Sequence, residues 1–175
     1  MKDILKDIEN RFQVSDIVQQ KERLAFATVD KSRAIALITW LKETASYSSM
    51  TLITAVDWLE DGVFQLTYLI NDPITGHEIG VRVMIDREEA TMESAHHLWK
   101  NAKTYQRELK EMYGIDFPGS PGVDEGFNLE GWDEMPPNRR DFDTKEYAEK
   151  TFFPRPGRKT NDPTKYMKSK LYPNK

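Results

Sequence analysis

With 175 residues, the chain is long enough for one domain of ordinary size and an extension. It contains no cysteine, which excludes disulfides, thiolate catalysis and cysteine-ligated zinc or iron–sulfur clusters within the chain. A formal net charge of −4 argues against a general nucleic-acid-binding protein.

The sequence predicts neither a membrane span nor a secretory signal. No run approaches the roughly 18 apolar residues that cross a bilayer, and residues 1–4 begin an amphipathic segment unlike a signal peptide. We therefore expect a protein kept in the cytoplasm that can dock on a membrane complex. The charged fraction of 31% and the lack of cysteine hint at a thermophilic source.

The first part of the chain predicts two helices and a strand between them. Residues 2–12 carry apolar side chains at helical spacing. The short apolar run 24–29 suits a strand. Asp30 can cap a second helix, which ends near Ser46 and keeps its apolar residues on one face.

Three strands are predicted next, over residues 50–58, 63–70 and 78–85. Apolar residues alternate with other residues along the second and third, which is typical of a sheet with one buried face. Turn-forming residues at 60–62 and 71–76 connect the strands. The segment therefore predicts an antiparallel meander.

Two further helices are expected over residues 88–99 and 102–113, the second of which ends at Gly114 as its C-cap. The order of elements indicates an α+β fold, with an antiparallel-rich sheet and helices packed on one face. We assign this domain to residues 1–117.

Residues 118–175 predict a long extended tail. They contain eight of the nine prolines, yet they keep aromatic residues, which disordered linkers usually lack. The charge also divides: 119–149 holds 3 basic and 9 acidic residues, a net of −6, whereas 150–175 holds 8 basic and 1 acidic, a net of +7. A solvated tail and surfaces for separate partners both remain open from charge alone, but the aromatic content favours a tail held by partners.

Candidate catalytic residues are few. Glu108 and Glu111 share a helix face, with Arg107 one turn before Glu111, and the spacing suits either acid–base chemistry or a surface ion pair of about 0.3–0.5 kcal/mol. No nucleophile or substrate motif accompanies them. His96 and His97 are adjacent and point about 100° apart on a helix, so they suit a shared metal poorly. We therefore assign no catalytic, cofactor-binding or metal-binding residue.

Residues 105–117, YQRELKEMYGIDF, resemble the segment Y-E-R-E-x-x-D-M-F-G-I-x-F. That segment marks the small hydrophilic 30 kDa subunit of respiratory complex I and its relatives among membrane-bound hydrogenases and sulfur-reducing complexes. Residues 55–58, AVDW, are similar to the family's A-V-D-Y, and residues 137–142, PNRRDF, to its P-L-R-K-D-F. Trp132 stands where the family often has a tryptophan, so the resemblance spans about residues 50–142.

The chain departs from the family's pattern at several positions. Gln106 replaces the first glutamate of the motif, and Glu111 replaces its aspartate. Residues 119–125, GSPGVDE, replace the usual G-H-P-D-L-R-R and lack its histidine and both arginines. These departures suggest a divergent archaeal-type member, as in ferredoxin-linked membrane-bound hydrogenase or sulfane sulfur reductase complexes.

The resemblance implies a non-catalytic accessory subunit in the peripheral arm of a membrane-bound oxidoreductase that couples ferredoxin- or NAD(P)H-derived electron transfer to ion translocation. Its implied partners are a hydrogenase-like large subunit and iron–sulfur subunits, which would hold the clusters, while the tail would wrap these partners. Its implied location is the cytoplasmic side of the cell membrane. The expected residues at the interface with other subunits are Arg107, Glu108, Glu111, Tyr113, Phe117, Trp132, Arg139, Arg140 and Phe142.

Two alternatives of other classes remain. One is a stand-alone small enzyme that uses Glu108 and a histidine, and the other is an adaptor that grips an unrelated partner with its tail. The aromatic residues of the tail favour either interaction class over the enzyme. The acceptor of the electrons, whether protons, sulfane sulfur, a quinone or another carrier, would be decided in other chains.

Overall fold

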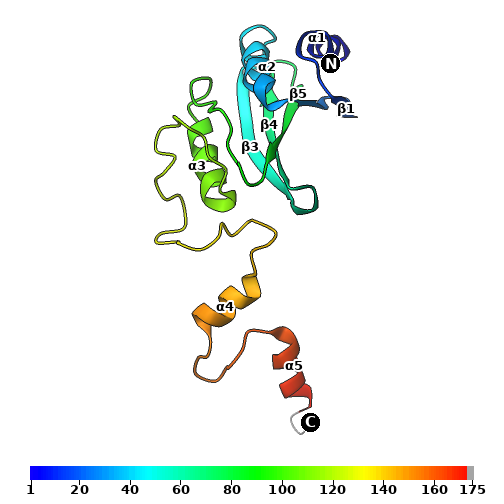
Figure 1. Cartoon of the computed structure of the whole chain (residues 1–175). Coiled ribbons are helices and arrows are strands. Elements are labelled where there is room, and N and C mark those ends of the chain that lie inside the picture. The colour runs from blue at the N-terminus through cyan, green and yellow to red at the C-terminus, as the bar shows by residue number, and fades with distance from the viewer. Residues whose placement is uncertain (173–175) are drawn as a thin grey trace. The chain divides into compact units, whose positions relative to one another are not determined.

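Figure 1 shows the computed structural model of the chain, which describes residues 1–172. The chain divides into two compact units, the first being Met1–Arg140 and the second beginning at Asp141. The first unit therefore includes the segment 118–140, which follows the predicted 1–117 domain. Ser120 and Val123 of this segment are buried.

The first unit has an α+β fold, as the sequence predicts. Its elements in chain order are α1 Lys2–Phe12, β1 Asp16–Lys21, β2 Leu24–Val29, α2 Lys31–Glu43, β3 Ser49–Trp58, the 3₁₀ turn η1 Leu59–Asp61, β4 Val63–Asn71, β5 Glu78–Asp86 and α3 Ala102–Tyr113. The bounds of α1, β2 and α3 are those predicted, and the three strands of the predicted meander are also present.

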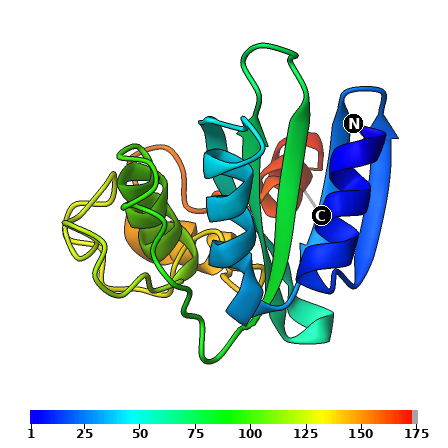
Figure 2. The ribbon, with the colours of Figure 1, turned by 90° about the horizontal axis from the view of Figure 1, so that it is seen from above.

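The strands of the described chain form one sheet in the order β1-β2-β5-β4-β3. β3, β4 and β5 make the antiparallel meander, β5 lies parallel to β2, and β1 closes the far edge antiparallel to β2. Figure 2 shows α1 and α2 on the same side of the sheet. The predicted arrangement of helices on one face of an antiparallel-rich sheet is therefore confirmed.

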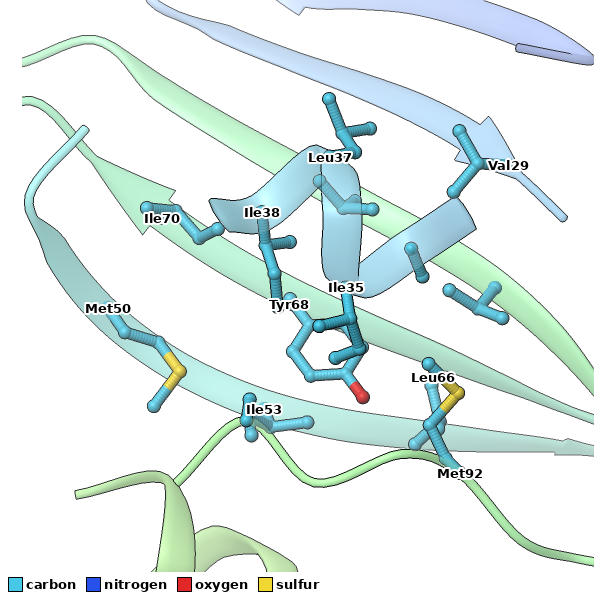
Figure 3. Close-up of a cluster of buried hydrophobic side chains, with 14 of the residues drawn as sticks. Val29, Ile35, Leu37, Ile38, Met50, Ile53, Leu66, Tyr68, Ile70 and Met92 are labelled. Carbon is cyan, nitrogen blue, oxygen red and sulfur yellow. The ribbon is translucent and has the colours of Figure 1, made fainter. Parts of the chain in front are cut away.

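The core lies between α2 and the inner face of the sheet (Figure 3). The alternating residues of β4 point into it, and Phe64, Leu66, Tyr68 and Ile70 have no exposed surface. Burying a side chain of this size contributes about 1.5–3 kcal/mol. Because side chains alternate along a strand, the other residues of β3, β4 and β5 point to the opposite face of the sheet.

Helix ends follow the local chemistry of the sequence. Asp30 caps α2, because its Oδ1 accepts the backbone N–H of Ser32 at 2.9 Å. The hydroxyl and backbone N–H of Ser32 hold the pKa of Asp30 below its usual value. α3 ends at Gly114 with φ 78°, the left-handed conformation that glycine adopts without strain.

The predicted helix over residues 88–99 is wrong. The Asp86 carboxylate accepts the backbone N–H groups of Glu88 and Glu89, both at 2.8 Å, and so turns the chain away from β5. The irregular segment that follows pairs with the chain after α3, where Met92 N–H donates to Asp116 O at 2.9 Å. Its apolar residues are buried, so their spacing reflects core packing and not a helix.

Side chains cover part of the sheet edge formed by β3. Trp99 Nε1 donates to Ser48 O at 2.8 Å, and Tyr105 OH donates to Thr51 O at 2.8 Å. Asn101 Nδ2 donates to a third carbonyl of this edge, at 3.1 Å. These contacts satisfy edge carbonyls that would otherwise be open to another strand, and they dock α3 along β3.

The second unit contains two short helices, α4 Thr144–Phe152 and α5 Pro163–Leu171, where the proline-rich sequence shows no helical periodicity. Each begins at an aspartate, Asp143 or Asp162, whose side chain accepts backbone N–H groups of the first turn. Between residues 1 and 172, no helix combines the length and the apolar character needed to cross a bilayer.

Candidate interaction surface

Helix α3 carries the motif residues, and two of them hold the backbone of a later segment. Glu111 accepts the backbone N–H groups of Phe127 at 2.7 Å, Asn128 at 2.8 Å and Leu129 at 3.1 Å. Desolvation alone would raise the pKa of Glu111, but these three donors outweigh it and hold the pKa below its usual value. Glu111 is therefore an anchor for this segment of its own chain.

Arg107 holds the same segment from one turn earlier. Its Nη2 donates to Gly126 O at 2.6 Å and its Nε to Glu125 O at 3.4 Å, while the guanidinium lies 5.7 Å from the ring centroid of Phe127. Arg107 and Glu111 thus bind carbonyl and N–H groups of one loop. The surface ion pair that the spacing suggests is replaced by two side-chain-to-backbone anchors.

A third residue of α3, Lys110, binds two carboxylates of the segment that follows the helix. Lys110 Nζ lies 2.7 Å from Asp116 Oδ1 and also pairs with Asp124. Hydrogen bonds to the two carboxylates raise its pKa. Beside it, a hollow of about 370 Å³ opens between α3 and the loop, with Trp132 and Pro136 among its walls.

Arg139 fastens the end of the first unit to the sheet. Its Nε donates to Tyr113 O at 2.8 Å, and its guanidinium lies 5.3 Å from the centroid of Phe64. Tyr113 packs edge-on against the same ring at 5.9 Å. Gly114 leaves room for this segment, because a Cβ there would lie in a tight contact of 3.2 Å with Arg139 Nη2.

Asp57 is the most buried ion-pair residue of this surface. Its carboxylate receives Arg87 Nε at 2.9 Å and Nη2 at 3.2 Å, and the backbone N–H of Arg140 at 2.9 Å. Desolvation acts to raise the pKa of Asp57, but the bonds from Arg87 and from Arg140 lower it overall. The Arg140 side chain reaches outward and pairs with Glu60.

The structure separates the predicted interface residues by their contacts inside the chain. Phe117 is fully buried, and Trp132 Nε1 donates to the carbonyls of Glu134 and Met135. Phe142 belongs to the second unit, where its ring lies 5.6 Å from that of Tyr147.

Glu108 differs from its neighbours on α3. It is half-buried, and within residues 1–172 its carboxylate makes no hydrogen bond or ion pair. Of the charged motif residues, it alone makes no such bond within residues 1–172. The partner contacts of all nine residues stay a prediction.

Gln106 and Arg87 are structural residues that the sequence pattern did not reveal. Gln106 is fully buried, and its Oε1 accepts the hydroxyls of Ser94 and Ser120, both at 2.8 Å. A neutral amide suits this buried position better than the charged glutamate of the motif. The position of Arg87 could have indicated its role: it lies two residues beyond Ile85, so it continues the inner face of the sheet, to which Asp57 also points.

The described residues hold no cluster of metal ligands. Between residues 1 and 172, no three side chains of histidine, cysteine, aspartate or glutamate lie close enough to hold a metal ion. The rings of His96 and His97 stand 6.0 Å apart at 86° to each other. The polar contacts of the surface instead serve to fix backbone.

This fold is shared with subunits of respiratory complexes. A solved chain described in the structure of the membrane-bound sulfane sulfur reductase, an archaeal respiratory membrane complex, matches with a TM-score of 0.79 and 25% identity, over 90% of this chain and 97% of that one. The trypsin-resistant fragment (1-134) of Nqo5 shares the fold, with a TM-score of 0.59, 18% identity and coverage of 69% and 96%.

The chain belongs to the family of the 30 Kd subunit of respiratory-chain NADH dehydrogenase, whose model matches residues 27–148. The matching subunit of the NADH-quinone oxidoreductase of Moorella thermoacetica is 33% identical over 95 residues, which cover 54% of this chain and 64% of that protein, just under two thirds of its length. The equivalent protein of Citrifermentans bemidjiense is 29% identical, with coverage of 61% and 75%. The family resemblance of residues 105–117 is thereby confirmed.

Proposed function

We propose that this chain is a non-catalytic accessory subunit in the peripheral arm of a complex I-related membrane-bound oxidoreductase. The observation that carries the proposal is the similarity to the chain of the sulfane sulfur reductase complex, over 90% of this chain. The first unit is 140 of the 175 residues, or 80%, so the shared length reaches into the second unit. Both parts would then serve the same kind of assembly.

The role proposed for the first unit is to hold a rigid surface for a hydrogenase-like large subunit. The polar residues of α3 that could act on a substrate are instead bonded to the chain's own backbone, as in Arg107 and Glu111. Glu108 and the outward side chain of Arg140 remain at the surface for a partner. Rigid anchoring fits a subunit whose task is to keep electron-transfer modules at a fixed spacing.

The redox centres of such a complex would lie in its iron–sulfur and large subunits. Without cysteine, this chain cannot supply thiolate ligands to a cluster. We propose a peripheral position on the cytoplasmic side of the membrane, which agrees with helices that are too short or too polar to cross a bilayer in the described chain.

The proposed reaction of the whole complex is electron transfer from ferredoxin or NAD(P)H, coupled to ion translocation. The sequence 119–125, which lacks the histidine and arginines of the usual family segment, supports a hydrogenase-type or sulfane-reductase-type complex over a quinone reductase. The structure places Ser120 of this segment in the buried bond to Gln106.

Co-purification tests this proposal. The full chain carries an affinity tag in its native host, membranes are solubilised gently, and the co-purifying proteins are identified by mass spectrometry. We expect a hydrogenase-like large subunit, iron–sulfur subunits and antiporter-like membrane subunits in constant ratio. Glu108→Arg should reduce their recovery, whereas Glu9→Arg, the same change at an exposed position of α1, serves as the matched control. Recovery of a lone monomer would overturn the proposal.

A further inference from the structure

The face of the sheet that points away from α1 and α2 carries a cluster of exposed apolar side chains. Val56 and Trp58 are each 42% exposed, and Met84 is 43% exposed. The open face of an antiparallel sheet is usually polar. Exposed aromatic and methionine side chains that gather in one place are typical of interaction sites.

The sheet register brings these side chains together from three strands. Trp58 of β3 pairs with Val63 of β4, while Gln65 lies between Val56 and Met84. Directly paired residues on one face have neighbouring side chains. Together they form a hollow of about 310 Å³, lined by Trp58, Asp61, Val63, Gln65 and Met84, which we name the open-face hollow.

One carboxylate of this hollow has no partner within residues 1–172. Asp61 is exposed, and among the described residues its side chain makes no hydrogen bond or ion pair. Its neighbour Glu60 differs, because Arg140 neutralises it. None of the described residues that line the hollow is cationic. The hollow therefore offers one uncompensated negative charge beside an indole ring.

We propose that the open-face hollow is a docking site for an arginine or lysine side chain of a partner protein. The aliphatic stem would lie on Trp58 and Met84, and the charged head would reach Asp61. A cation over the face of an indole ring is further stabilised by the ring electrons. This site lies outside α3 and its loop, so it goes beyond the proposed function and adds a second surface.

The charge of the hollow favours a basic side chain over two other possible occupants, an anionic lipid headgroup and a second copy of this chain. Anionic lipid headgroups would be repelled by Asp61. A symmetric contact with a second copy would bring the same patch of both chains together, and with it two Asp61 carboxylates. Of these three occupants, a basic side chain of another protein is the one whose charge complements the hollow.

Site-specific photo-crosslinking tests the proposal in the full chain, expressed in its native host. p-Benzoylphenylalanine replaces Met84, and in a control it replaces Ile74, which is 88% exposed in the turn between β4 and β5. We expect the crosslinker at position 84 to react with one segment of another protein, and this segment should contain an arginine or lysine. Asp61→Lys should lower that yield about tenfold, because it sets two like charges together.

Reversal of the partner's cation to aspartate should restore the yield in the Asp61→Lys background. Crosslinks to lipid or to a second copy alone, a yield equal to that at Ile74, or a yield indifferent to Asp61→Lys would each overturn the proposal. Thermal unfolding of Asp61→Lys verifies that the chain still folds, and Asp61→Asn provides the milder variant. A crosslinker at Glu108 reports the proposed accessory role separately.

Discussion

The guanidinium of Arg87 lies against the carboxylate of Asp57, with Nε 2.9 Å from Oδ1, although 30 residues separate them in the chain. The two stand at neighbouring ends of the meander, and both are almost fully buried. The same carboxylate accepts the backbone N–H of Arg140. The pair therefore links two strand ends to the last residue of the first unit.

Asp57→Asn should strongly destabilise the first unit. The substitution keeps the shape but leaves the Arg87 charge buried without its counter-ion, and breaking a buried pair costs about 3–5 kcal/mol. Urea unfolding of the full chain, followed by circular dichroism, measures the loss. Asp133→Asn, at an exposed position, should change the free energy of unfolding by less than about 0.5 kcal/mol. Equal effects of the two variants would show that the pair contributes no special stability.

The same pair predicts how stability depends on pH. The pKa of Asp57 is lowered in the folded chain, so its ionised form is favoured by folding. That contribution is present above the unfolded pKa of about 3.9 and is lost as pH falls through the lower folded pKa. Acid titrations of unfolding should show a smaller loss of stability for Asp57→Asn than for the parent chain below about pH 4. Parallel titration curves would contradict this.

Arg139 and Arg140 should behave differently although they are adjacent and alike. Arg139→Ala removes the bond to Tyr113 O and the contact with the Phe64 ring, and should cost about 1–2 kcal/mol. Arg140→Ala keeps the backbone N–H that Asp57 accepts and loses only an exposed ion pair with Glu60, which solvent screens, so its effect should be smaller. Thermal unfolding of each single variant measures the difference, and a larger effect of Arg140→Ala would contradict the assignment.

The contrast between Arg139 and Arg140 also shows the limit of what the sequence could predict. Residues 105–117 led to the family, and the alternation in β4 led to the inner face of the sheet, because both signals are local. The anchoring of Arg139 and the pairing of Asp57 with Arg87 depend on segments brought together by folding. Local patterns therefore drew attention to these residues, but they could not show the contacts that the residues make within the folded chain.

Two differences from the predicted elements have physical reasons that can be named: β1 was missed, and the helix over residues 88–99 was predicted wrongly. β1 lies at the sheet edge, and Ile17 alone among its residues is even half-buried, so no alternation appears. Residues 88–99 bury apolar side chains at a spacing near that of a helix, but their backbone pairs with residues after α3. Both errors arise where tertiary contacts, and not local propensity, determine the backbone.

Glu111→Gln should loosen the loop that follows α3 while Glu108→Gln should not. An amide NH2 group, which donates and cannot accept, replaces one of the two carboxylate oxygens, so the N–H groups of Phe127, Asn128 and Leu129 are no longer all satisfied. Hydrogen exchange at these amides should become faster by about tenfold or more, as expected for a loss of about 1–3 kcal/mol. Glu108→Gln is the matched control one turn away. Unchanged exchange in both variants would remove the anchoring role of Glu111.

Gly114→Ala should cost more stability than Gly119→Ala, although both glycines have nearly the same positive φ, 78° and 80°. In each variant the backbone strain of an alanine at positive φ costs about 1–2 kcal/mol. At Gly119 the added Cβ meets nothing within 4 Å, whereas at Gly114 it meets Arg139 Nη2 at 3.2 Å and Pro136 Cγ at 3.3 Å. The difference in unfolding free energy between the two variants therefore reports the close packing of residues 136–139 on the end of α3. If the two costs were equal, residues 136–139 would yield to the added Cβ without cost, and the close packing at Gly114 would contribute no stability.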